Sequence, residues 1–158
     1  MNSGLLMVLL KNDDYTKKYF LGIGFENSKL KINSYPTLTI LNTDLSSGPG
    51  EHWCVAFFPD KQTCEYFDPF GMSPKVEKSH NFFPLLCQNG ANQILYSTKQ
   101  VQSIHEGTCG QHCVYFACLR SQGISMSEIV NNYYSDNLAL NDKKVVDFVK
   151  HQRMIYNV

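Results

Sequence analysis

The sequence predicts an α+β fold in which a small mixed or antiparallel sheet packs against helices. Three observations support this fold class. Short segments rich in β-branched and aromatic residues recur along the first two thirds of the chain, and two of them flank a turn, as in a hairpin. The last third carries apolar residues at helical spacing. With 158 residues, 43% of them hydrophobic, the chain is long enough to bury a core, and we expect one domain over residues 1–158.

The first forty residues predict one helix and two strands. Residues 2–10 are apolar enough to form a short helix, and residues 19–23 and 37–41 have the β-branched and aromatic content of strands. Residues 46–50 contain two glycines and a proline, which favour a loop.

A hairpin is predicted in the middle of the chain. Residues 53–58 form an almost continuously apolar arm, residues 59–62 have turn composition, and residues 63–68 form the second arm. Residues 93–96 resemble a further strand.

The last third of the chain predicts helices. One runs from Cys109 to about Gln122, with Gly123 placed for a left-handed cap. Residues 125–128 have the spacing of a capping box that starts a new helix. A final helix is marked by its apolar stripe of Val145, Val146, Phe148 and Val149.

Charge and cysteine usage narrow the classes of function. Fourteen basic residues balance fourteen acidic ones, so no overall field favours nucleic acid or an anionic membrane. The basic run near residues 143–153 is interrupted by aspartates and is interpreted as a solvated helix face. The apolar start, residues 4–10, lacks a preceding basic residue and is too short to span a bilayer, so we expect no membrane association and a reducing intracellular compartment.

One set of residues could support nucleophilic catalysis by a thiol. Such catalysis needs a thiolate, a histidine that maintains it and a group that orients the histidine. Cys109 begins a predicted helix, where unpaired N–H groups and the helix dipole favour negative sulfur. His52 and Asp68 flank the predicted hairpin, whose ends meet in an antiparallel pair. The same residues could also be a small core cysteine, a histidine at the rim and an Asp-Pro strand end.

Blocks of sequence extend this set into a longer pattern over residues 19–122: Tyr19-Phe20-Leu21-Gly22, Ile40-Leu41-Asn42-Thr43, Gly50-Glu51-His52-Trp53, Thr63-Cys64-Glu65-Tyr66-Phe67-Asp68-Pro69-Phe70-Gly71, Ser97-Thr98-Lys99-Gln100-Val101-Gln102 and Cys109-Gly110-Gln111-His112-Cys113. In these blocks the chain resembles the adenovirus endopeptidase (adenain) family of cysteine proteases, especially the members of Maverick/Polinton elements and related viruses.

The resemblance implies a fold, a set of catalytic residues, a class of substrates and a location. It implies an adenain-like fold with the catalytic cysteine at the N-terminus of a central helix. His52 would be the base, Asp68 its orienting partner and Cys109 the nucleophile, and the side chain of Gln102 would donate to the oxyanion beside the backbone N–H of Cys109. The implied substrates are virion precursor proteins with glycine near the cut. The implied location is the host cell, with nucleus, cytoplasm and packaging in the virion left open.

The chain departs from the adenoviral pattern at two places. Adenoviral members usually carry Glu at the position of Asp68, although the related SUMO-type proteases use Asp. Ala91 falls where adenovirus proteases have the cysteine that takes on a disulfide-linked activating peptide. We therefore expect no cofactor, and the resemblance leaves a peptide or DNA activator open for a chain without net charge.

Three other functions are compatible with parts of the sequence. A zinc site could use His105, Cys109, His112 and Cys113, although no Cys-x-x-Cys pair is present. A protease of ubiquitin-like modifiers would use the same order of triad residues. A binding module without activity is disfavoured because all four site positions are intact. His105 and His112 are expected in a loop and on a helix surface, and the cysteines other than Cys109 in the core.

Overall fold

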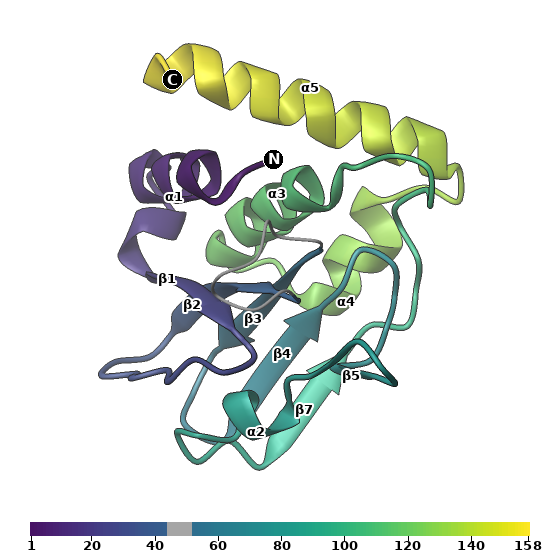
Figure 1. The fold of residues 1–158 in the computed structure, drawn as a ribbon. Helices are drawn as coiled ribbons and strands as arrows, with labels where there is room; N and C mark the ends of the chain where they lie inside the picture. Colours follow the sequence, from purple (N-terminus) through teal and green to yellow (C-terminus); the bar gives the residue numbers. More distant parts are fainter. Residues whose placement is uncertain (44–51) are drawn as a thin grey trace.

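The computed structural model describes residues 1–43 and 52–158, and in these residues a sheet is covered by helices (Figure 1). The predicted loop at residues 46–50 lies outside the described residues. Helices α1 and α3 lie over one side of the sheet, and α5 crosses above them as an outer layer (Figure 1). The fold is therefore α+β, as predicted.

The main sheet has five strands in the order β1-β2-β3-β4-β7. Their bounds are Phe20–Phe25 (β1), Thr37–Asn42 (β2), Trp53–Phe58 (β3), Thr63–Phe67 (β4) and Gln93–Tyr96 (β7). Strands β2, β3 and β4 are antiparallel, while β1 pairs with β2 and β7 with β4 in parallel. The sheet is thus mixed, and the predicted hairpin is its centre.

Both faces of the central strand β3 are buried, which explains its continuous apolar sequence. Side chains alternate between faces along a strand. Val55 and Phe57 therefore join the core under α1, α3 and α5, while Ala56 and Phe58 join a second core on the opposite face. The sheet is held from both sides, so the two ends of the β3–β4 hairpin are fixed relative to the helices.

The helices follow the predicted positions closely. The long ones are Ser3–Asn12 (α1), Cys109–Ser121 (α3) and Leu138–Tyr156 (α5), and short turns occur at Thr16–Lys18 (η1), Met126–Glu128 (α4) and Ile129–Tyr133 (η2). The Ser125 hydroxyl accepts a hydrogen bond from the Glu128 N–H at 3.2 Å, as the capping box predicts. None of the helices in the described ranges combines the length and the apolar character that crossing a bilayer requires.

A small unit between β4 and β7 was not predicted. It consists of a two-stranded hairpin, Lys75–Val76 (β5) and His80–Asn81 (β6), and a one-turn helix, Phe83–Leu86 (α2). These elements are too short to give a periodic signal. Phe82, Leu85 and Leu86 pack into the second core, so this unit covers the face of the sheet opposite α3.

The chain leaves β4 through a turn that allows a close backbone contact. Gly71 has a φ of +70°, and a Cβ at this position would lie 2.6 Å from the carbonyl oxygen of Thr98. The amides of Val101 and Gln102 donate to the Pro69 carbonyl at 2.9 and 3.1 Å. The segment that leads toward α3 is therefore bound directly to the residues that follow Asp68.

Candidate active site

The hairpin brings His52 and Asp68 together although sixteen positions separate them. His52 precedes β3 and Asp68 follows β4, and the two residues meet at the end of these central strands. His52 Nε2 lies 2.8 Å from Asp68 Oδ1, and the carboxylate is 1% exposed. The Phe70 N–H donates to the same Oδ1 at 2.8 Å, and the Phe70 ring stacks on the imidazole with centroids 4.8 Å apart. The imidazole is therefore held at one nitrogen and along one face.

Cys109 is the first residue of α3 and is a hydrogen-bond partner of His52. Since Asp68 occupies Nε2, Nδ1 remains for the sulfur. Burial alone would raise the pKa of the thiol, but His52 and the backbone N–H groups of Trp53 and Gly110 outweigh burial and lower this pKa. For His52, burial opposes the charge, but the bonds to Asp68 and Cys109 raise its pKa. The pair favours a thiolate facing an imidazolium.

Trp53 closes one side of this corner, as expected from its position beside His52. Its side chain is buried, and its indole N–H donates to the carbonyl oxygen of Met1 at 3.1 Å. The Met1 side chain in turn covers Gly110, where an added Cβ would lie 2.8 Å from the Met1 Cβ. Met1 thus packs against the start of α3, the helix that Cys109 begins.

Gln102 is buried beside the turn that follows Asp68. It is 1% exposed, and its side-chain Nε2 donates to the Glu106 carbonyl at 2.6 Å. An amide nitrogen carries two hydrogens, so one N–H remains for another acceptor. The amide is held in one orientation by the Glu106 carbonyl, and Oε1 has no partner in the described structure.

A cavity of about 300 Å³ opens beside the imidazole and contains residues that sequence reasoning missed. His52, Asp68 and Phe70 line it together with Met72 and His80. Burial lowers the pKa of His80, whose Nδ1 lies 3.0 Å from the Ser79 hydroxyl. A histidine on a two-residue strand gives no signal in the sequence, so only the fold connects His80 with Asp68.

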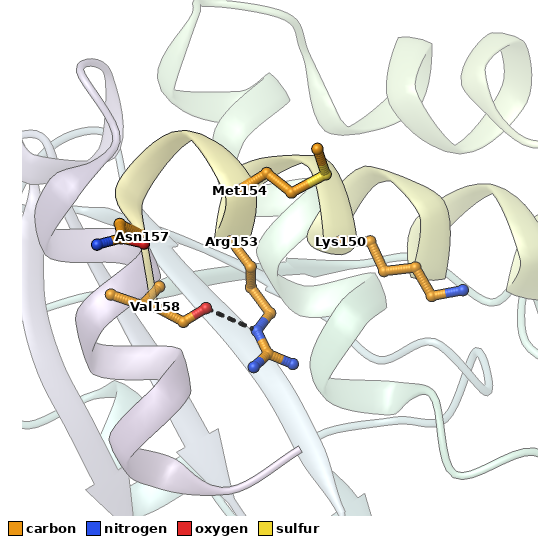
Figure 2. Close-up of a pocket in the computed structure, with 5 residues that line it drawn as sticks. All are labelled: Lys150, Arg153, Met154, Asn157 and Val158. Carbon is orange, nitrogen blue, oxygen red and sulfur yellow. Dashed lines mark hydrogen bonds between the residues drawn. The ribbon is translucent and has the colours of Figure 1, made fainter.

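A larger cavity, of about 540 Å³, lies at the C-terminal end of α5 (Figure 2). Its lining residues are Lys150, Arg153, Met154, Asn157 and Val158, and Arg153 Nε donates to the Val158 carbonyl at 3.0 Å. It contains neither a thiol nor an imidazole. This cavity therefore lacks the thiol and the imidazole that lie together where the ends of β3 and β4 meet the start of α3.

Part of the chain is similar in sequence to curated viral proteases. The protease of Bovine adenovirus 2 is 31% identical over 86 residues, which is 49% of this chain and 42% of that protein. The protease of Porcine adenovirus A serotype 3 is 33% identical over 88 residues, 49% of this chain and 43% of that protein. The chain thus spans less than half the length of these relatives. No family model matches it.

Solved structures show the same fold. A crystal structure of the ASFV pS273R protease superposes with a TM-score of 0.58 and 16% identity, covering 96% of this chain and 68% of that one. A selenomethionine form of that protease gives a TM-score of 0.51 and 21% identity, over 73% of this chain and 43% of that one. The chain therefore shares the fold of that protease over the superposed residues.

A group of potential metal ligands lies near Cys109, and its chemistry argues against a metal centre. Among residues 1–43 and 52–158, His52, Cys54 and Asp68 are the only three such residues whose ligand atoms all lie within 4.8 Å. His52 is already bonded to Asp68. Burial raises the pKa of the Cys54 thiol to about 11, and the Tyr66 hydroxyl donates to its sulfur at 3.1 Å. Cys54 is thus a neutral thiol beside the imidazole.

The zinc set considered from the sequence does not assemble in the folded chain. Cys109 faces His52, and His105 lies exposed in a turn. His112 was expected on a helix surface, but this is wrong, because the residue is fully buried and bonded to Asp142 and Tyr134. Cys87 was expected in the core and is exposed. The error at His112 arises because its partners come from later helices, which helical spacing alone does not reveal.

Proposed function

We propose that the chain is a cysteine endopeptidase, formed by a single domain over residues 1–158, with Cys109 as nucleophile. The observation that carries this proposal is the 2.8 Å contact between His52 Nε2 and Asp68 Oδ1, in a histidine whose hydrogen-bond partner is Cys109 at the start of α3. A nucleophile, a base and an orienting group in series are what acyl transfer by a thiol requires.

In the first half of the reaction, the Cys109 thiolate attacks the carbonyl carbon of the scissile peptide bond. A C–S bond forms, and the carbonyl electron pair moves to oxygen. Two donors then stabilise the oxyanion: the free N–H of Gln102 Nε2 and the backbone N–H of Cys109, which has no partner within its helix. As the C–N bond breaks, the imidazolium of His52 gives its proton to the leaving amine.

In the second half, a water molecule attacks the thioester. Neutral His52 takes one proton from that water, and the C–S bond breaks to release the carboxylic acid and restore the thiolate. Asp68 keeps the imidazole oriented through both steps and stabilises its charged form.

We propose that the substrates are virion precursor proteins cut after or beside glycine, in an infected host cell. The viral relatives and the adenain resemblance support this substrate class. Gly107 has no neighbouring heavy atom near its Cβ position, and this leaves open space along the approach to Cys109.

The test is a peptide library incubated with the purified protein, with the cut sites read by mass spectrometry. We expect cuts next to glycine by the wild-type protein and none by Cys109→Ala or His52→Ala. Cys118→Ala is the matched control, because that buried thiol lies on the same helix and faces no histidine in the proposed mechanism. Equal turnover by wild-type and Cys109→Ala proteins refutes the proposal. If the protein cleaves only ubiquitin-like modifiers, these modifiers replace virion precursor proteins as the proposed substrates.

A further inference from the structure

A buried carboxylate on the last helix binds both ends of the segment that leads into the nucleophile. Asp142 lies near the start of α5 and is 5% exposed. Its Oδ2 accepts from the Ser103 N–H at 3.1 Å and from the Ser103 hydroxyl at 2.5 Å. Its Oδ1 accepts from the Thr108 hydroxyl at 2.7 Å and lies 2.9 Å from His112 Nε2. Ser103 follows Gln102, and Thr108 precedes Cys109.

The contacts and the lowered pKa of His112 together favour one arrangement of protons in this cluster. A carboxylate has about four acceptor sites, and Asp142 uses all of them if His112 donates from Nε2. His112 is then neutral, and its Nδ1 accepts from the Tyr134 hydroxyl, 3.2 Å away. Burial lowers the pKa of His112. For Asp142, burial opposes the charge, but the bonds from Ser103, His112 and Thr108 outweigh it and lower the pKa.

Asn141, the residue before Asp142, binds the backbone on the other side of Gln102. The Asn141 side-chain nitrogen donates to the Val101 carbonyl at 3.0 Å and to the Ser135 carbonyl at 2.9 Å. Asn141 is 2% exposed, and its oxygen accepts from the N–H and hydroxyl of Ser135. The backbone is therefore held immediately before and immediately after Gln102 by two consecutive side chains of α5.

Asp142 also determines what the hydroxyl of Thr108 does. Thr108 occupies the N-cap position of α3, where a threonine side chain usually accepts from the first free N–H groups of the helix. Here it makes no such bond, because its hydroxyl is turned to Asp142. The N–H groups at the start of α3 thus stay available to the sulfur and to a developing oxyanion.

From these contacts we infer that Asp142 is a positioning residue that holds Gln102 and Cys109 in the geometry of the oxyanion site. The inference rests on the proposed peptidase function. It assigns a role to a helix that lies beyond the region of family resemblance, residues 19–122. A shift of about 1 Å in such donors can lower a rate roughly 100-fold, and so a fixed backbone on both sides of Gln102 matters for the chemical step.

The experiment compares Asp142→Asn, Ser103→Ala and Thr108→Val with Asp147→Asn, an exposed aspartate of the same helix that pairs with Lys143. Steady-state cleavage of a quenched peptide with glycine before the cut separates kcat from KM. We expect Asp142→Asn to lower kcat about tenfold or more with KM within about twofold of wild type. Ser103→Ala and Thr108→Val should lower kcat less, and Asp147→Asn should leave both unchanged.

Two further readouts separate positioning from loss of structure. Alkylation of Cys109 by iodoacetamide depends on His52 and should stay near wild type in Asp142→Asn. Hydrogen exchange should accelerate at the Ser103 amide in that variant and not in Asp147→Asn. If Asp142→Asn has the same kcat as Asp147→Asn, the inference is overturned. It is also overturned if Asp142→Asn loses alkylation of Cys109 and turnover in parallel. If Asp142→Asn does not fold, unchanged kcat in both Ser103→Ala and Thr108→Val overturns it. A wild-type protein without turnover refutes the proposed function instead, and amide exchange still tests the Asp142 contacts.

Discussion

The pKa values of Cys109 and His52 move in opposite directions, and this fixes the sign of the pH dependence. The thiol pKa is lowered from 9.0 and the imidazole pKa is raised from 6.5. The thiolate and the imidazolium therefore coexist at pH values between these two shifted pKa values. We expect kcat/KM to rise with pH on a limb centred below pH 9, as the thiolate forms. It should fall on a limb centred above pH 6.5, as the imidazolium loses its proton. Because Cys109 and His52 interact, the two apparent pKa values of this profile describe the pair as a whole and not either residue alone.

Alkylation tests the same pair without any substrate. We expect the rate at Cys109 to follow the lowered thiol pKa in the wild-type protein. In His52→Ala the midpoint should move upward, because burial then acts on the thiol without the opposing imidazolium. Peptide mapping is needed, since the exposed Cys87 thiol also reacts. A Cys87→Ser background removes that signal, and an unchanged midpoint in His52→Ala contradicts the ion pair.

Gln102 is expected to act only when negative charge develops on the substrate oxygen. Gln102→Ala should therefore lower kcat by about 10²–10³ while changing KM little. Alkylation of Cys109 should remain near normal, since it needs the thiolate and no oxyanion donor. Gln93→Ala is the control, because that exposed glutamine begins β7 and makes no contact with Gln102 in the proposed mechanism. An unchanged kcat in Gln102→Ala removes this residue from the mechanism.

At the scale of elements, the turn after β4 is expected to tolerate no side chain at Gly71. Gly71→Ala meets a positive φ and a backbone carbonyl 2.6 Å away. The backbone conformation alone costs roughly 1–3 kcal/mol, and the contact with Thr98 adds to it. Gly123→Ala is the matched control, since Gly123 has a φ of +91° but no neighbour within 4 Å. Urea unfolding should show a clearly larger loss of stability for Gly71→Ala; equal losses would mean that the contact is unimportant.

The end of α3 opposite Cys109 is attached to the sheet by one arginine. Arg120 Nε donates to Glu65 Oε2 at 2.7 Å, and its guanidinium lies 4.2 Å from the centre of the Phe57 ring. Both charged side chains are largely buried. We expect Arg120→Ala to lower the free energy of unfolding by roughly 2–3 kcal/mol, because Glu65 loses its partner.

The control for Arg120 is Lys143→Ala, which breaks an exposed pair with Asp147 and should leave the free energy of unfolding nearly unchanged. A double-mutant cycle with Glu65→Gln measures the coupling directly. Additive losses would show that the helix end is held by packing alone. The pH profile of Cys109 should be unchanged in Arg120→Ala, since the ion pair with Glu65 is at the other end of the helix.

At the scale of the whole molecule, the sequence predicted what depends on local period and on hairpin geometry. The β3–β4 hairpin and the meeting of His52 with Asp68 follow from two β-branched and aromatic segments joined by a short turn, and α3 follows from its helical spacing. The contact between His52 and Cys109 needs helix packing over more than fifty positions. The residue types suggested this pair among other interpretations, and the family resemblance singled it out. His112 and Asp142 could not be placed, because a polar pair buried between two helices has the same sequence pattern as an exposed one.

The chain contains a single tryptophan, and it stands at the candidate site. The Trp53 backbone N–H bonds to the Cys109 thiol, and its indole N–H bonds to Met1. The intrinsic fluorescence of the molecule therefore comes from one indole beside the nucleophile. Acylation of the sulfur should change that emission without any added label, and stopped-flow fluorescence could then time the acylation step directly. Cys109→Ala supplies the blank, because its indole keeps the same surroundings but has no sulfur beside it.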